Sequence, residues 1–281
     1  MISFYSTISS CQVNKHDLRG WDFRLFQDTE AWSLAKAVRD QDTMQIEKQI
    51  KGRSIPVDFQ EEVYGQSLLH LAVENELVNS SKKLLSLGAN PNHTDISNGD
   101  TPMHNSVGYH CETDDTTILA LLIKYGGDPN GLNAVINIPG RGGSRSVLFE
   151  AASKYTAINR IKYLVEKGAD VNFVNSGGWS VIANCLISKN YDVVLYLLQS
   201  GKLQYKDVAF INASGEKQYL QDMMRDDFIS LESPQYKYKL EVIDFLKKNG
   251  IDYRATPIPE NIIERAKANY PDTWQDYLSK Y

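Results

Sequence analysis

The chain has 281 residues, of which 42% are hydrophobic and 23% are charged, which is ordinary for a folded globular protein. Its formal net charge of −5 argues against generic nucleic-acid binding, because that activity needs a basic surface. The longest apolar runs, 118–123 and 193–198, are far shorter than the roughly 20 residues of a membrane span, and three scattered cysteines exclude a disulfide framework or a zinc site.

The N-terminal region is expected to comprise an arm and a pair of helices. Residues 1–27 show no periodicity, and Phe23, Leu25 and Phe26 are expected to pack in an extended N-terminal arm. An acidic helix start at 28–30 and a second helix from Asp42 to Lys51 predict a capping helix pair over residues 28–64.

The first residues bear on where the protein is located. They show neither a basic region nor an apolar core, so a signal peptide is not readable and a cytoplasmic location is expected. The alternative is a periplasmic or lipid-anchored protein, if the true start lies upstream and Cys11 is a lipidation site.

A turn-and-helix signature recurs after the first 64 residues. Gly65-Gln-Ser-Leu-Leu-His70 and Gly99-Asp-Thr-Pro-Met-His104 lie 34 residues apart, and each couples a glycine turn to a capped helix start. Each repeat also closes on a similar sequence, seen as Gly-Ala-Asn-Pro-Asn at 88–92, Gly-Gly-Asp-Pro-Asn at 126–130 and Gly-Ala-Asp-Val-Asn at 168–172. The glycines predict left-handed helix ends.

These motifs resemble those of the ankyrin-repeat family, whose period is about 33 residues. The resemblance implies an all-α solenoid of stacked helix-turn-helix units. About five repeats, the last divergent, are expected over 65–253, followed by C-terminal capping helices over 254–281 that begin after Pro259 and Pro271. The repeat spacing is irregular, and the largest insertion is 131–145.

Three sets of residues could suggest catalysis, metal binding or phosphate binding. His70 and His104 occupy equivalent repeat positions, which favours hydrogen bonds to nearby backbone over metal binding or catalysis. His93, His104, His110 and Cys111 fit no zinc spacing, so no metal and no cofactor are expected. The glycine-rich segment 140–145 lacks the lysine of a phosphate-binding loop and is interpreted as a surface insertion that contacts a protein.

A narrower resemblance comes from Phe26–Val38, Val57–Gln60 and Tyr64–Leu69, which are similar to bacterial ankyrin proteins. Some members of that group act as immunity proteins against secreted antibacterial toxins, including lipases of type VI secretion. The resemblance implies a non-catalytic, protein-binding scaffold that neutralises such a toxin and is monomeric when free. The alternatives are an ankyrin effector acting on host proteins, and an enzyme whose site combines the 131–145 insertion with His104 or His110.

The expected partner-binding residues lie in turns and loops along the solenoid. Trp179 and several tyrosines there would offer large contact areas with a polar group. The full set is Tyr64, Gln66, Asn98, Asp100, Tyr109, Arg141, Arg145, Lys154, Trp179 and Lys189.

Overall fold

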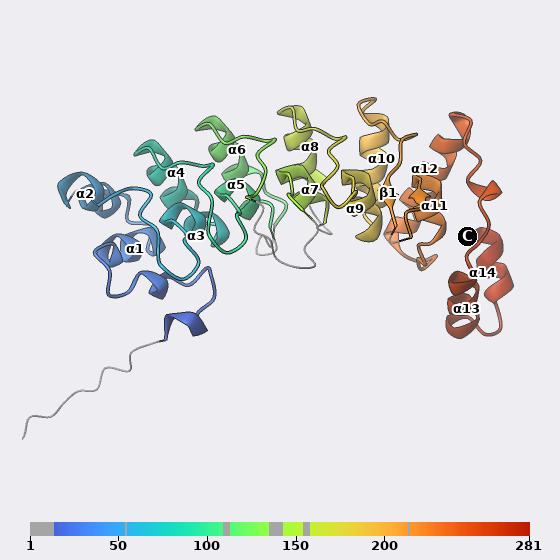
Figure 1. Ribbon diagram of the computed structural model, residues 1–281, viewed down its shortest axis with the longest axis horizontal. Coiled ribbons are helices and arrows are strands. Elements are labelled where there is room, and N and C mark those ends of the chain that lie inside the picture. Colours follow the sequence, from blue (N-terminus) through green and yellow to red (C-terminus); the bar gives the residue numbers. More distant parts are fainter. Residues whose placement is uncertain (1–13, 54, 109–112, 135–142, 154–157, 213) are drawn as a thin grey trace, which may run out of the picture.

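The computed structural model describes residues 14–53, 55–108, 113–134, 143–153, 158–212 and 214–281. Helices pair up along the chain, and the pairs stack side by side into an elongated solenoid (Figure 1). An inner row contains α1 (Trp32–Arg39), α3 (Leu68–Glu74), α5 (Pro102–Asn105), α7 (Val147–Ala152), α9 (Val181–Ile187) and α11 (Leu220–Arg225). An outer row contains α2 (Thr43–Arg53), α4 (Val78–Ser86), α6 (Thr117–Lys124), α8 (Ile158–Glu166), α10 (Tyr191–Gln199) and α12 (Pro234–Lys248).

Later inner helices begin at hydroxyl caps of the kind that the turn-and-helix signature predicts. Ser146 and Ser180 hold extended backbone, and their hydroxyls accept the backbone N–H of Phe149 (3.1 Å) and Ala183 (3.2 Å). Such bonds satisfy donors that the first helical turn leaves without a partner. At the other end of a repeat, Gly88 has a φ of 96°, as the predicted left-handed helix end requires.

A continuous apolar core runs between the two rows of helices. The inner helices contribute much of it: every residue of α7 is buried, and so is every residue of α3 except Glu74. Successive inner helices contact one another, α3 with α5, α5 with α7 and α7 with α9. Each fully buried leucine or valine contributes roughly 1.5–3 kcal/mol through burial, and contacts between neighbouring repeats join this core along the stack.

The N-terminal arm differs from the extended segment that was predicted. Phe23–Phe26 forms a 3-10 turn in which Phe23, Leu25 and Phe26 are all buried. Helix α1 begins at Trp32 rather than at residues 28–30, because Asp28 takes a left-handed conformation with a φ of 61°. The Thr29 hydroxyl instead accepts the backbone N–H of Ala31 at 3.2 Å.

The fifth unit contains a hairpin that the repeat pattern did not predict. Strand β1 (Phe210–Ile211) pairs antiparallel with β2 (Lys217–Gln218) ahead of α11. Helix α12 then begins at Pro234, because the Ser233 hydroxyl caps it through the backbone N–H of Gln235.

The chain ends in α13 (Glu260–Asn269) and α14 (Trp274–Lys280), which follow Pro259 and Pro271 as predicted. Ile262, Ala266, Tyr277 and Tyr281 form a small core between them that is separate from the main one. Within the described parts of the chain, no helix is both long and apolar enough to span a membrane.

Candidate functional site

The turns that precede the inner helices share one device. In each of them the oxygen of an acidic or amide side chain accepts backbone N–H groups across the turn. Asp95 accepts those of Ser97, Asn98 and Gly99 at 2.8–3.0 Å, and Asn175 accepts those of Gly177 and Trp179 at 2.9 Å. The same role falls to Glu61, Asn133 and Asn212. These bonds hold the described residues of the turns in place before any partner binds.

The two repeat histidines connect consecutive turns, as predicted. The Nδ1 of His104 lies 2.9 Å from the Thr101 hydroxyl and accepts the Thr101 backbone N–H, so the ring proton is assigned to Nε2. Nε2 then donates to the carbonyl of Arg145 in the next repeat, at 3.1 Å. His70 makes the equivalent contacts with Ser67 and with the carbonyl of Asp100.

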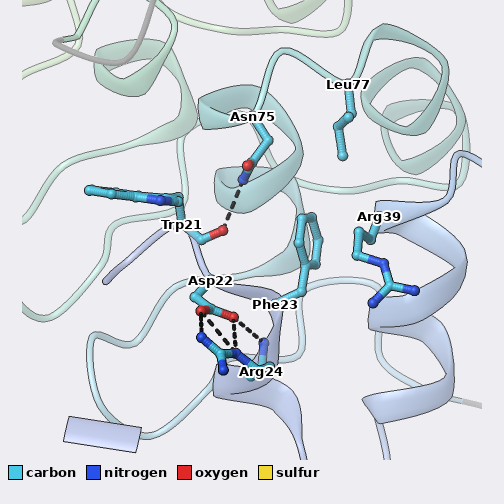
Figure 2. A pocket seen from close by; sticks show the side chains of 7 residues that line it. All are labelled: Trp21, Asp22, Phe23, Arg24, Arg39, Asn75 and Leu77. Atoms are coloured by element: carbon cyan, nitrogen blue, oxygen red, sulfur yellow. Dashed lines mark hydrogen bonds and ion pairs between the residues drawn. The ribbon is translucent and has the colours of Figure 1, made fainter. Parts of the chain in front are cut away.

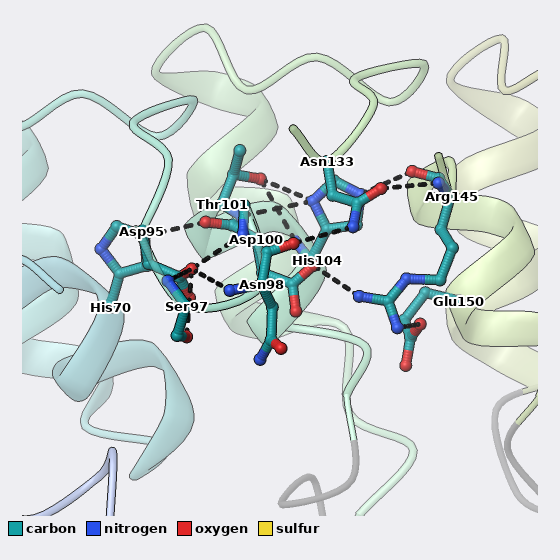
Figure 3. A network of polar contacts seen from close by, with 11 residues as sticks. His70, Asp95, Ser97, Asn98, Asp100, Thr101, His104, Asn133, Arg145 and Glu150 are labelled. Carbon is teal, nitrogen blue, oxygen red and sulfur yellow. Dashed lines mark hydrogen bonds and ion pairs between the residues drawn. The ribbon is translucent and has the colours of Figure 1, made fainter. Parts of the chain in front are cut away.

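Arg145 belongs to a polar network that spans two repeats (Figure 3). Its guanidinium is 2.8 Å from Asp100 and 3.3 Å from Glu150. Burial raises the pKa of Asp100 to about 6, although the positive charge of Arg145 opposes that shift. Asn133 accepts the backbone N–H of Arg145 at 2.6 Å, which closes the base of the 131–145 insertion.

Three large aliphatic side chains recur at one exposed position of successive turns. Leu132, Val174 and Ile211 each precede the turn asparagine, and their exposed fractions are 48%, 51% and 45%. Because stacked repeats place equivalent positions on the same side of a solenoid, the three form a surface that we call the apolar stripe. Exposed apolar groups that line up in this way are typical of interaction surfaces.

Trp179 forms the floor of a cleft with a volume of about 510 Å³, which we call the Trp179 cleft. Its indole stacks on Phe210 with ring centroids 3.5 Å apart. Met223 and Phe228 add apolar lining, and Lys189 and Arg265 stand among the polar lining residues.

A second cleft, of about 390 Å³, lies between the N-terminal segment and the first repeats (Figure 2). Its polar groups bind one another: Arg24 forks onto the Asp22 carboxylate at 2.6–3.0 Å, and Asn75 donates to the carbonyl of Trp21 at 3.0 Å. We interpret this cleft as the junction that fastens the N-terminal segment to α3.

The structure places seven of the ten expected partner-binding residues. Tyr64 donates its hydroxyl to the carbonyl of Leu18 at 2.7 Å, and Gln66 is buried beside Gly20. Asn98, Asp100 and Arg145 meet in the network of Figure 3.

Trp179 and Lys189 line the Trp179 cleft and do not belong to the network of Figure 3. Lys189 forms an ion pair with Asp227 at 3.1 Å. The remaining three residues, Tyr109, Arg141 and Lys154, lie outside the described residues.

Sequence reasoning missed the residues that complete these surfaces. Phe210 and Arg265 lie in the divergent fifth unit and in the C-terminal helices, where the repeat signature gives no guide. The apolar stripe did carry a signal, because an aliphatic residue precedes asparagine three times at the turn positions.

The metal and phosphate alternatives concern segments that are only partly described. Across the described ranges, no three histidine, cysteine, aspartate or glutamate residues lie close enough to hold a metal ion. His110, Cys111 and residues 140–142 of the glycine-rich segment lie outside those ranges.

Comparison with known proteins identifies the repeats. A family model for a single ankyrin repeat matches residues 64–96, and a model for three copies of ankyrin repeats matches residues 108–207. No curated protein matches the chain. The structure contains the stacked helix pairs of such repeats. Ankyrin repeats form scaffolds that bind other proteins. The chain is therefore an all-α ankyrin-repeat solenoid that serves as a protein-binding scaffold.

Proposed function

We propose that this scaffold is a bacterial immunity protein that binds a secreted antibacterial toxin and neutralises it by covering its active site. The motifs in residues 26–38, 57–60 and 64–69, which are similar to those of bacterial ankyrin proteins of the immunity type, support this role. A cytoplasmic, monomeric protein remains our prediction, which fractionation and light scattering would test.

The observation that carries the proposal is the apolar stripe. Three exposed aliphatic side chains on consecutive turns present a surface that water solvates poorly. The asparagine that follows each of these three residues accepts backbone N–H groups, and backbone held by such bonds costs less to order when a partner binds. Both features favour tight binding of a folded protein.

We also propose that the chain does not catalyse a reaction. His104, one of the two histidines considered as a base, is buried, and both of its ring nitrogens have partners within the turns. A general base needs a ring nitrogen within reach of substrate, and this arrangement gives His104 a structural role instead.

The test is co-expression with the toxins encoded beside the gene, read out by growth rescue and by co-purification. We expect the wild-type chain to restore growth and to capture one toxin. The triple variant Leu132→Ser/Val174→Ser/Ile211→Ser should retain at least fivefold less toxin.

A matched control changes two exposed apolar residues of the outer helices, Met44→Ser/Leu240→Ser, which should bind as the wild type does. Surface substitutions of this kind change stability by about 0.5 kcal/mol or less each, so circular dichroism should show both variants folded. Capture of no toxin by the wild-type chain, or equal capture by the triple variant, would overturn the proposal.

A further inference from the structure

The C-terminal helices do more than close the end of the stack. Figure 1 shows α13 and α14 on the side of the inner row rather than in line with the outer helices. Helix α13 thereby brings Arg265 to the Trp179 cleft. The other lining residues come from α9 and the residues on either side of it, from the β1–β2 hairpin, and from α11 and the three residues that follow it. The cleft thus combines aromatic side chains from the repeats, Trp179 and Phe210, with a cation from the C-terminal helices, Arg265.

Most charged groups around the cleft already have partners. Asp227 is buried, pairs with Lys189 and accepts the hydroxyl of Tyr191 at 2.8 Å. Asp226 accepts the side-chain amide of Asn261 at 2.8 Å. These bonds leave little negative charge in the cleft available to a basic ligand.

Arg265 differs from these groups. Its guanidinium lies over the ring of Phe228, 4.6 Å from the centroid, and none of the described residues accepts a hydrogen bond from it. A guanidinium over an aromatic ring can still donate from N–H groups that point away from the ring, and this fork of donors matches the two oxygens of a carboxylate. The side-chain amide of Gln218, another lining residue, likewise bonds to none of the described residues.

We propose that the Trp179 cleft binds a segment of the partner protein in which a large apolar side chain stands next to a carboxylate. The apolar side chain lies against Trp179 and Phe210, and the carboxylate pairs with Arg265. This inference rests on the proposed protein-binding function but specifies the chemistry of the bound segment.

The test uses the full chain and a displayed library of random heptapeptides as the probe. Enriched peptides should contain an aromatic or large aliphatic residue within two positions of an aspartate or glutamate. A synthetic peptide of that sequence should bind at least tenfold more weakly when its acid is replaced by the matching amide. Arg265→Gln and Trp179→Ala should each weaken its binding by a similar factor.

Lys267→Gln is the matched control, because Lys267 is an exposed cation on the same helix that lies over a different ring, that of Trp274. It should leave the affinity unchanged. Enrichment of basic peptides, enrichment of none, or an unchanged affinity in Arg265→Gln would overturn the inference. None of these outcomes would affect a result in which toxin capture depends on the apolar stripe. The experiments can therefore overturn this inference without overturning the proposed function.

Discussion

At the scale of single residues, the repeat histidines act as neutral rings that join turns. Burial lowers the pKa of His70 to about 3 and that of His104 to about 4. Each ring must be neutral to accept at Nδ1 while it donates at Nε2. Their contribution to stability is therefore complete above the ordinary histidine pKa of 6.5 and is lost as the pH falls toward 4 and 3.

We expect His104→Ala to lower the free energy of unfolding by about 2–3 kcal/mol at pH 7. The substitution leaves the carbonyl of Arg145 and the N–H of Thr101 without partners and opens a small cavity. Urea denaturation followed by circular dichroism measures the loss. The exposed His16→Ala is the control, and a loss below about 0.5 kcal/mol for His104→Ala would show that the ring does not join the turns.

Glu74 is expected to affect stability in the opposite direction, favouring the folded state at low pH. Burial, followed by the charges of Asp95 and Asp100, raises its pKa from 4.5 to about 7. A carboxyl whose pKa rises on folding favours the folded state at low pH, and that contribution is lost as the pH rises to 7.

Glu74→Gln should therefore stabilise the protein by about 2 kcal/mol at pH 8 and have almost no effect at pH 4. The amide can still accept from Asn105, which donates to Glu74 at 3.3 Å, so packing is retained. The urea midpoints of the wild type and of Glu74→Gln, compared at pH 4 and at pH 8, test this prediction. A gain of equal size at both would assign the effect to packing rather than to charge.

The residue-level role of the histidines was predictable because two copies at equivalent positions can be compared with each other. The stacking of Trp179 on Phe210 was not predictable. The two residues are 31 positions apart in the sequence, and the hairpin that carries Phe210 lies in the unit that diverges most from the repeat pattern.

At the scale of elements, the asparagines that end the first three repeats form a ladder along the solenoid. Asn130 donates from Nδ2 to the carbonyl of Gly168 at 3.0 Å and accepts the N–H of Asp170 at 2.8 Å. Asn92 and Asn172 bind the repeats that follow them in the same way. These bonds explain why the closing motifs at 88–92, 126–130 and 168–172 all end in asparagine.

Asn130→Asp should cost about 1 kcal/mol, because the carboxylate keeps the acceptor but places a negative oxygen against the Gly168 carbonyl. Thermal unfolding measures this loss of stability. Asn269→Asp is the control, because the Nδ2 group of Asn269 donates within a single helix. Equal losses in the two variants would mean that the ladder adds nothing between repeats.

The helix starts were predictable wherever a serine or threonine cap precedes an apolar run. The start of α12 was not, because Ser233, which caps the helix at Pro234, lies in the mostly polar segment 230–235 rather than directly before an apolar run. The 3-10 turn at Phe23–Phe26 was also missed, since four residues are too few to show a period.

At the scale of the whole molecule, the chain has one extended core and a small separate core in the C-terminal helices. Lys239 lies at the junction: its buried ammonium donates to the carbonyls of Met224 (2.8 Å) and Asp227 (3.2 Å) and lies 4.2 Å from the centre of the Tyr281 ring. The fold class was predictable from the repeats, but the placement of the C-terminal pair beside the inner row depends on such long-range contacts.

Native-state hydrogen exchange of the free protein should show that α13 and α14 open at lower free energy than α7 to α10. Only four buried residues form the C-terminal core, whereas α7 to α10 have neighbouring helices on both sides. Equal protection across all of these helices would instead indicate a single cooperative unit.

The central claim is that a partner protein binds where the turns expose the apolar stripe and the Trp179 cleft. Hydrogen exchange of the complex with the co-purified toxin, compared with the free chain, tests it most directly. The account predicts new protection in the turns that carry Leu132, Val174 and Ile211 and in α9, β1 and α11. Protection confined to the outer helices α4, α6, α8 and α10 would contradict it.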